Sequence, residues 1–319
     1  MTHLQSICLT ICLLTAGVVA VCGAQAEPLS IGEKIEFDTH RADGRKEKLF
    51  GYLLLPADAQ GKVPAMVIAH GSSGVRQVRE GRYLEEFAKM GVASLVIDCF
   101  APRGVEDTVA DQSKVPTAQM IRDAVAALQF LTANARIDAA RIGVIGFSKG
   151  GSVSLLSADQ RVYKSGPQFA VHIPVYPGCN TQYRNPKPTA PILMLLGEKD
   201  NYTGAVPCSE YAERIRQAGG EVVVTTYPGA HHGFDGPDNL TSNVWLARAQ
   251  NYSDCRIYIE DDGRLVEGKT GEVLDSTKKS YDVLRKTCLR HGATVATNRK
   301  ANRQSMEDIK SFLTKRLLK

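Results

Sequence analysis

The sequence lacks features that would assign it to several classes of protein. It has no cluster of lysine and arginine interleaved with aromatic residues, and its net charge of +5 is small for 319 residues. We therefore expect no nucleic-acid partner. Beyond residue 26 no apolar run is long enough to span a bilayer, so we expect no stable membrane insertion of the mature chain. Internal repeats and low-complexity segments are also missing, which leaves an ordinary globular protein.

Metal-binding patterns are missing too. The sequence has no H-E-x-x-H and no set of cysteines and histidines at zinc spacing. Only the adjacent pair His231-His232 invites a metal interpretation, and no further carboxylate or histidine cluster accompanies it. We expect neither a metal site nor a cofactor.

The first 26 residues contain no Lys, Arg, Asp or Glu, and their apolar run ends in the small-x-small pattern Ala24-Gln25-Ala26. This predicts a secretory signal peptide over residues 1–26 and an exported protein, periplasmic or secreted. A retained membrane anchor is one alternative, because the run is close to the minimum length for a span. Cys22 suggests a lipoprotein as another, although the bulky Val21 before it argues against lipidation.

Five cysteines remain after cleavage, namely Cys99, Cys179, Cys208, Cys255 and Cys288. An oxidising compartment favours their pairing, and the odd number leaves at least one free thiol. Cys99 follows an apolar run and is interpreted as that buried thiol. Spacing alone does not determine how the other four pair.

Apolar runs alternate with amphipathic segments along the chain. The apolar runs predict buried strands at 64–70, 91–98, 141–147, 169–177, 190–200 and 221–229. The amphipathic segments predict helices at 82–90, 117–133, 208–218 and 303–318, with one more helix directly after Ser148. This order predicts an α/β fold with a mostly parallel, doubly wound sheet and helices on both faces. In such sheets ligands bind beyond the carboxyl ends of the strands.

Residues 249–297 interrupt this alternation. The segment is polar and rich in turns, and Cys255 and Cys288 bracket most of it. We interpret it as an insertion in a single domain that spans 27–319. It is predicted to contain a hairpin at 256–268 and a helix from Ser276 to Arg290.

The stretch Gly146-Phe147-Ser148-Lys149-Gly150 matches G-x-S-x-G between a predicted strand and a predicted helix. In a nucleophile elbow the flanking glycines allow a strained turn that exposes the serine. The alternative is a turn that serves packing alone. The pattern is common by chance, so the assignment of Ser148 as a nucleophile depends on partners elsewhere in the chain.

Those partners follow in the required order of serine, acid and histidine. Asp200 lies just beyond one predicted strand, and His231 and His232 lie just beyond the next. Asp200 as a turn former or helix cap is the alternative interpretation. Asp235 is a weaker candidate acid because it is too close to the histidines to come from a separate strand end. The sequence thus predicts a Ser-His-Asp triad, with the choice of histidine open.

A serine hydrolase also needs two backbone donors for the oxyanion. The first is the N–H of Lys149, directly after the nucleophile. The second should come from the glycine-rich loop after the strand at 64–70, where we favour the N–H of Ser72.

With these motifs the chain resembles the dienelactone hydrolase family of α/β-hydrolases. The resemblance covers roughly residues 60–247 and 293–317, in the stretches IAHGSSGVR, VIDCFAPRG, RIGVIGFSKGG, LLGEKDNYT and YPGAHHGFD. It implies the α/β-hydrolase fold and hydrolysis of small esters or lactones. The family's histidine precedes a small residue and Phe, so the resemblance selects His232 as the base. It also suggests Arg103 as a substrate-binding residue.

The chain departs from the archetypal enzymes at two positions. Ser148 occupies the place of their nucleophilic cysteine, and Gly71 that of a glutamate. The resemblance places the loops of Cys179 and Cys208 side by side, which favours that pair and leaves Cys255 with Cys288. Tyr202 is a further candidate for the substrate pocket.

Taken together, these features predict a serine hydrolase that cleaves carboxylic esters or lactones through an acyl-enzyme. A peptidase or thioesterase would use the same triad. A non-catalytic binding protein that retains the fold is the alternative from another class. The sequence does not predict an oligomeric state.

Overall fold

The structure, a computed structural model, describes residues 29–57, 60–163, 165–237, 242–275 and 278–319. The predicted signal peptide at 1–26 lies outside the described residues. Within the described ranges, no helix combines the length and the apolar character that a membrane span requires.

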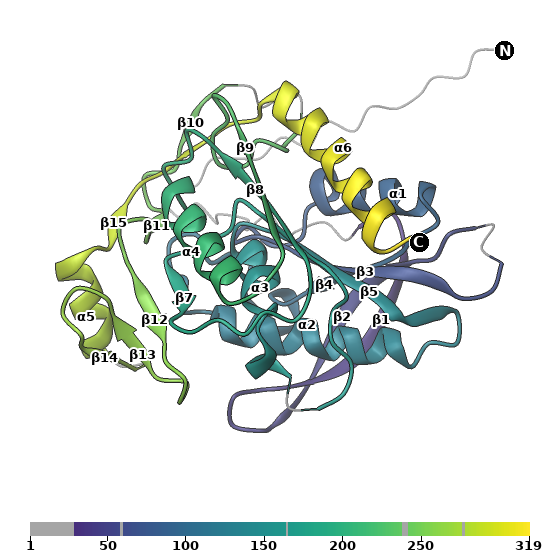
Figure 1. Ribbon diagram of the computed structural model, residues 1–319, viewed down its shortest axis with the longest axis horizontal. Helices are drawn as coiled ribbons and strands as arrows, with labels where there is room; N and C mark the ends of the chain where they lie inside the picture. The colour runs from purple at the N-terminus through teal and green to yellow at the C-terminus, as the bar shows by residue number, and fades with distance from the viewer. Residues whose placement is uncertain (1–28, 58–59, 164, 238–241, 276–277) are drawn as a thin grey trace, which may run out of the picture.

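An eight-stranded sheet forms the centre of the molecule, in the order β1-β2-β4-β3-β5-β6-β8-β9 (Figure 1). β2 pairs antiparallel with β1 and with β4, and all other neighbours are parallel. The predicted mostly parallel sheet is confirmed. Its strands are β1 (Glu33–His40), β2 (Lys46–Leu54), β3 (Val63–Ala69), β4 (Ala93–Asp98), β5 (Ile137–Phe147), β6 (His172–Val175), β8 (Ile192–Gly197) and β9 (Val222–Tyr227).

Helices cover both faces of this sheet, which is why its central strands are buried throughout. Alternate side chains of β3 illustrate the two layers. Met66 belongs to the apolar cluster that includes α1 (Arg82–Lys89) and α6 (Arg299–Arg316). Val67 belongs to the cluster that includes α2 (Thr117–Thr132) and α3 (Lys149–Leu156). A third cluster joins α3 and α4 (Ala205–Gln217) to β8.

Two features of the sheet and helices differ from the sequence prediction. The hairpin of β1 and β2 was not predicted, because its strands EKIEFDTH and KEKLFGYLL carry charges on an exposed face and lack a continuous apolar run. The last helix begins at Arg299, four residues before the predicted start at Arg303. The side chain of Asn298 accepts a hydrogen bond from the amide of Ala301, and this cap sets the helix start.

The segment 249–297 forms small sheets and a helix at one side of the molecule (Figure 1). The predicted hairpin is present as β12 (Ile257–Ile259) and β13 (Leu265–Glu267). The predicted helix is present as α5 (Lys278–Thr287), which ends before the predicted Arg290, while residues 276 and 277 lie outside the described residues. β12 also pairs in parallel with β7 (Thr181–Tyr183) of the main body. The other short strands of this segment are β11 (Gln250–Asn251), β14 (Val273–Leu274), β15 (Arg290–His291) and β16 (Thr294–Val295). β10 (Val244–Trp245) lies just before the segment and pairs with β16.

Candidate active site

Ser148 forms the sharp turn between β5 and α3. Its φ of 55° lies in a region that residues other than glycine rarely adopt. A Cβ at Gly146 would lie 2.0 Å from the carbonyl oxygen of Gly150, and one at Gly150 would lie 2.0 Å from that of Ala69. Both positions therefore require glycine. The turn packs tightly and also presents Ser148 to a cavity, so the two interpretations of the sequence are compatible.

The side chains of Ser148, His232 and Asp200 form one hydrogen-bonded chain. His232 Nε2 lies 2.9 Å from Ser148 Oγ, and His232 Nδ1 lies 2.8 Å from Asp200 Oδ2. A carboxylate only accepts hydrogen bonds, so Nδ1 carries the proton and Nε2 is left to accept from the serine hydroxyl. The rings of Tyr176 and Tyr202 each lie with their centroid 4.8 Å from that of the imidazole. Both rings therefore pack against the imidazole.

Asp200 is buried and held in its charged form. Burial by itself raises the pKa of Asp200, but the neighbouring His232 and the hydrogen bonds from His232 and Thr203 outweigh it and keep the pKa below its usual value. Asp200 Oδ1 also accepts from the amides of Tyr202 and Thr203, at 2.8 and 2.9 Å. The carboxylate is therefore fixed and ionised beside the imidazole.

Asp235, the other candidate acid, has different partners. Its carboxylate accepts from the hydroxyl groups of Tyr176 and Tyr83, at 2.5 and 3.1 Å. Asp200 rather than Asp235 contacts the imidazole. His231 is absent from the walls of the cavity, whereas His232 lines it.

The two residues predicted to supply the oxyanion donors both lie near Ser148. Lys149 opens α3, where the first N–H groups have no partner within the helix. Ser72 lines the cavity just after β3. Gly71, which precedes Ser72, lies against Ser148, because a Cβ there would be 3.6 Å from Ser148 Cβ. Burial lowers the pKa of the Lys149 ammonium group to about 7.

A cavity of about 250 Å³ opens at Ser148. The end of the segment 249–297 lines it through Val295, Ala296 and Thr297. Val244 of β10 and the nearby Leu246 also line it. The segment thus forms part of the wall of the site, which the sequence did not predict. The apolar side chains that line the cavity include Val109, Val244, Leu246, Val295 and Ala296. Tyr202, a predicted pocket residue, also lines the cavity.

Arg103 is not part of this cavity, which corrects the prediction of a substrate-binding role. Its guanidinium group pairs with Asp123 at 2.6 Å and with Glu47 at 2.5 Å, and it donates to the carbonyl oxygen of Cys99 at 2.7 Å. Its side chain is only 9% exposed. These partners, one of them on β2, already engage the hydrogen-bond donors of the guanidinium.

Arg79 is the residue that sequence reasoning missed. It lies in the π-helical turn Gln77–Gly81 before α1 and lines the cavity. Its Nε lies 3.7 Å from Asp235 Oδ1, and its side chain is 19% exposed. The run of charged residues after the glycine-rich loop was the available signal, but it did not indicate which arginine faces inward.

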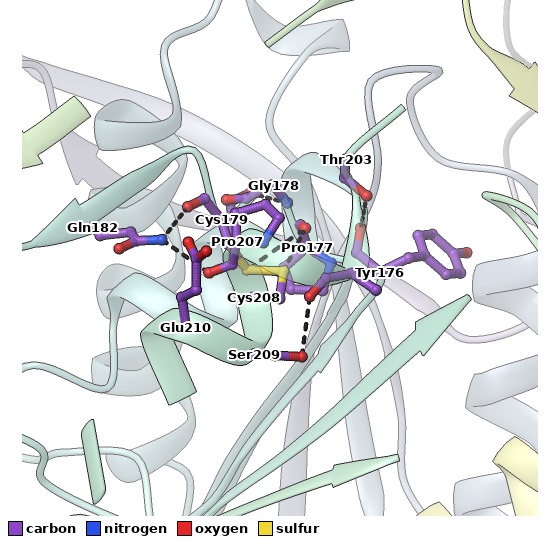
Figure 2. Close-up of a disulfide and its surroundings, with 12 residues drawn as sticks. Tyr176, Pro177, Gly178, Cys179, Gln182, Thr203, Pro207, Cys208, Ser209 and Glu210 are labelled. Carbon is purple, nitrogen blue, oxygen red and sulfur yellow. Dashed lines mark hydrogen bonds between the residues drawn. A yellow bond between two sulfur atoms is a disulfide. The ribbon is translucent and has the colours of Figure 1, made fainter. Parts of the chain in front are cut away.

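Both disulfides expected from the resemblance are present, as Cys179–Cys208 and Cys255–Cys288, and Cys99 is a buried free thiol. Figure 2 shows the first bridge joining the loop after β6 to the first turn of α4. Beside it, Thr203 Oγ1 lies 3.3 Å from the carbonyl oxygen of Tyr176. The bridge therefore braces the loop that carries Asp200.

Comparison with known proteins is consistent with this geometry. A relative from Bradyrhizobium sp, named "Probable 2-oxo-3-(5-oxofuran-2-ylidene)propanoate lactonase", is 27% identical over 206 residues, which cover 59% of this chain and 79% of the relative. A solved dienelactone hydrolase-like promiscuous phosphotriesterase from metagenomic libraries is 16% identical with a TM-score of 0.55, and the match covers 89% of this chain and 99% of that one.

A solved thermophilic esterase from the Planctomycetes species Thermogutta terrifontis is 18% identical with a TM-score of 0.54, and the match covers 67% of this chain and 87% of that one. At these identities the two structures support the α/β-hydrolase fold. The family model of the dienelactone hydrolase family matches residues 49–257, well over half of the sequence. The chain belongs to the dienelactone hydrolase family.

Proposed function

We propose that the chain is a serine hydrolase that cleaves carboxylic esters or lactones through an acyl-enzyme. The observation that carries the proposal is the position of one imidazole, that of His232, in contact with both Ser148 Oγ and Asp200 Oδ2. A serine hydroxyl is a weak nucleophile until an adjacent base accepts its proton, and the base needs an acid to orient it. Family membership supports the same activity.

In this mechanism Ser148 Oγ attacks the carbonyl carbon of the substrate while its proton passes to His232 Nε2. Asp200 accepts a hydrogen bond from Nδ1–H and stabilises the imidazolium. The amides of Ser72 and Lys149 donate to the oxyanion. His232 then protonates the leaving alcohol, and water activated by the same imidazole attacks the acyl-enzyme and releases the acid.

The size and the walls of the cavity favour a small substrate over a peptide. Its volume of about 250 Å³ is slightly below the usual range of small-molecule sites, about 300–1,000 Å³. Its apolar lining residues suit a short hydrocarbon chain or a lactone ring. An extended peptide would need a groove on both sides of the nucleophile. We therefore place ester or lactone cleavage ahead of peptidase activity.

Arg79 adds a preference for substrates with a negative charge. Its guanidinium stays protonated in proteins and suits a carboxylate. The lactonase to which the chain is similar bears the name of a substrate with a propanoate group. We propose that Arg79 attracts an anionic substituent on the ester or lactone.

We further propose that the protein is exported and folds as one domain with residues 249–297 inserted. The two disulfides support an oxidising compartment, where such bonds persist. Cys179–Cys208 lies within the main body, and Cys255–Cys288 lies within the insertion. N-terminal sequencing of the mature protein tests cleavage before Glu27.

The central experiment combines labelling with turnover. A fluorophosphonate should label the protein at Ser148, as located by mass spectrometry, and Ser148→Ala should abolish labelling. The same variant should lose roughly 10³-fold or more in kcat on p-nitrophenyl butyrate while remaining folded. An unlabelled but folded wild-type protein would instead support a non-catalytic binding protein. A panel of ester, thioester and amide substrates separates the remaining alternatives.

A further inference from the structure

Gln112 connects the two residues whose amides are the proposed oxyanion donors. It lies in the loop that precedes α2. Its side-chain amide donates from Nε2 to Ser72 Oγ at 3.0 Å, and its Oε1 accepts from Lys149 Nζ at 3.0 Å. The backbone oxygen of Gln112 accepts a second hydrogen bond from Lys149 Nζ, at 2.9 Å. One side chain thus spans the gap between the loop after β3 and the start of α3.

Neighbouring contacts of the same loop act on the same two residues. The amide of Thr108 donates to the carbonyl oxygen of Ser72 at 2.8 Å, and Thr108 Oγ1 lies 3.4 Å from Lys149 Nζ. Ser72 is therefore held through both its hydroxyl group and its carbonyl oxygen. Lys149 is fixed at its far end, because its side chain is buried and points into this loop.

The inserted segment holds Gln112 itself in place. Gln250 of β11 accepts from the amide of Gln112 at 2.9 Å through Oε1, and its own amide donates to the carbonyl oxygen of Val109 at 3.0 Å. These two hydrogen bonds fix the loop at two points three residues apart. The chain of contacts thus runs from the insertion through Gln112 to both oxyanion donors.

Burial makes this arrangement costly to disrupt. Ser72 and Lys149 are 7% and 6% exposed, so water cannot easily replace a lost partner. A buried polar group without a partner costs about 1–3 kcal/mol. If the amide of Gln112 is removed, the serine hydroxyl and the lysine amine are expected to seek other partners, and their backbones must shift.

We infer that Gln112 is a positioning residue that holds the amides of Ser72 and Lys149 at the spacing required by the oxyanion. The inference rests on the proposed function, because it assumes that an oxyanion forms between these amides. Gln112 touches neither substrate nor Ser148 in this role. Its effect should appear in the transition state and leave substrate binding unchanged, as expected of electrostatic stabilisation that depends on preset donors.

The test uses three variants of the full-length mature protein. Gln112→Met keeps the length of the side chain and removes its hydrogen bonds. Gln112→Glu keeps two acceptor oxygens, which can pair with Lys149 Nζ and Ser72 Oγ. Ser113→Ala is the matched control, because its hydroxyl bonds only to Asp111 in the same loop at 2.6 Å and is exposed. Thermal unfolding is measured for each, so that activity is compared well below every midpoint.

The expected result is a split between kcat and KM. With p-nitrophenyl butyrate, Gln112→Met should lower kcat about 10–100-fold with KM within twofold, since loss of a whole oxyanion donor costs roughly 10²–10³-fold. The rate of labelling of Ser148 by fluorophosphonate should fall by a similar factor. Gln112→Glu should recover kcat to within about fivefold of wild type, and Ser113→Ala should match wild type.

Two outcomes overturn the inference without touching the proposed function. One is labelling of Ser148 at the wild-type rate in Gln112→Met. The other is a rise in KM at constant kcat, which would make Gln112 part of the substrate pocket only. Failure of the proposed function gives a different result, because the wild-type protein itself would then remain unlabelled at Ser148.

Discussion

The hydroxyl of Thr203 lies 2.8 Å from Oδ2 of Asp200, the same carboxylate oxygen that contacts His232. Thr203 also donates its backbone amide to Asp200 Oδ1. The residue therefore holds both oxygens of the carboxylate. The loop after β8 thus carries the Asp200 carboxylate and also fixes the orientation in which it meets the imidazole.

Thr203→Val should lower kcat about fivefold to tenfold with little change in KM. The substitution keeps the shape of the side chain and removes one hydrogen bond to a charged group, worth about 1.5–3 kcal/mol when intact. Steady-state kinetics on p-nitrophenyl butyrate checks this, with Thr203→Ser as the matched control that retains the hydroxyl. An equal loss in the serine variant would count against the role of the hydrogen bond.

Asp200 and Asp235 offer a paired test of the acid. Asp200→Asn should reduce kcat by roughly 10³–10⁴-fold, since an amide no longer selects the productive tautomer of His232. Asp235→Asn should change kcat less than tenfold, because its carboxylate contacts Tyr176 and Tyr83 instead. It should lower the melting temperature, since those contacts are buried. The assignment fails if the two variants lose kcat to the same extent.

Arg79 and Arg82 both lie near Asp235, at 3.7 and 3.8 Å, but only Arg79 lines the cavity. Arg79→Gln should raise KM for mono-p-nitrophenyl succinate about tenfold, equivalent to about 1.4 kcal/mol. KM for the uncharged p-nitrophenyl propionate should stay within twofold. Arg82→Gln is the control, and an equal rise in its succinate KM would point to a general effect on Asp235.

The two disulfides close loops of similar length, with sequence separations of 29 and 33. Replacing either cysteine pair by serine should cost about 3–4 kcal/mol of unfolding free energy in the chain-entropy model, as measured in urea. The effects on activity should differ, because Cys179–Cys208 braces the loop of Asp200. Loss of that bridge should lower kcat severalfold more than loss of Cys255–Cys288. Identical kcat values would show that the brace is purely structural.

The sequence was informative where one local pattern dictates one structure. Continuous apolar runs predicted β3, β4, β5, β6, β8 and β9, because strands packed inside an α/β protein carry mostly apolar residues. Ser148, Asp200 and His232 could be named because each lies within a few residues after the end of such a strand. The order of the strands then brings their ends together at one edge.

Arg103 illustrates where such reasoning stops. Its position in the sequence matched a substrate-binding role, but its actual partner Glu47 lies on β2, a strand that had not been predicted. Arg79 was missed for the complementary reason. The direction of its side chain depends on a π-helical turn, which no sequence pattern indicates. In both cases the role of a long charged side chain was decided by tertiary neighbours.

Glu80 should make the stability of the protein depend on pH. Burial raises the pKa of Glu80 to about 7, with the charge of Arg79 opposing this shift only in part. The folded state thus holds a proton that the unfolded state releases near the ordinary pKa of about 4.3 for glutamate. The stability that this proton contributes is complete below about pH 4 and is lost as the pH rises to about 7. Over this window the loss amounts to roughly 4 kcal/mol.

Glu80→Gln mimics the protonated side chain at every pH and should remove that dependence. Urea unfolding at pH 5 and at pH 8 is expected to give the variant the smaller change in unfolding free energy, and to make it more stable than wild type at pH 8. Glu85→Gln in the neighbouring helix is the control, because Glu85 is exposed and should leave the wild-type profile intact. Parallel profiles for wild type and Glu80→Gln would mean that Glu80 is charged throughout this range, with Arg79 outweighing the effect of burial.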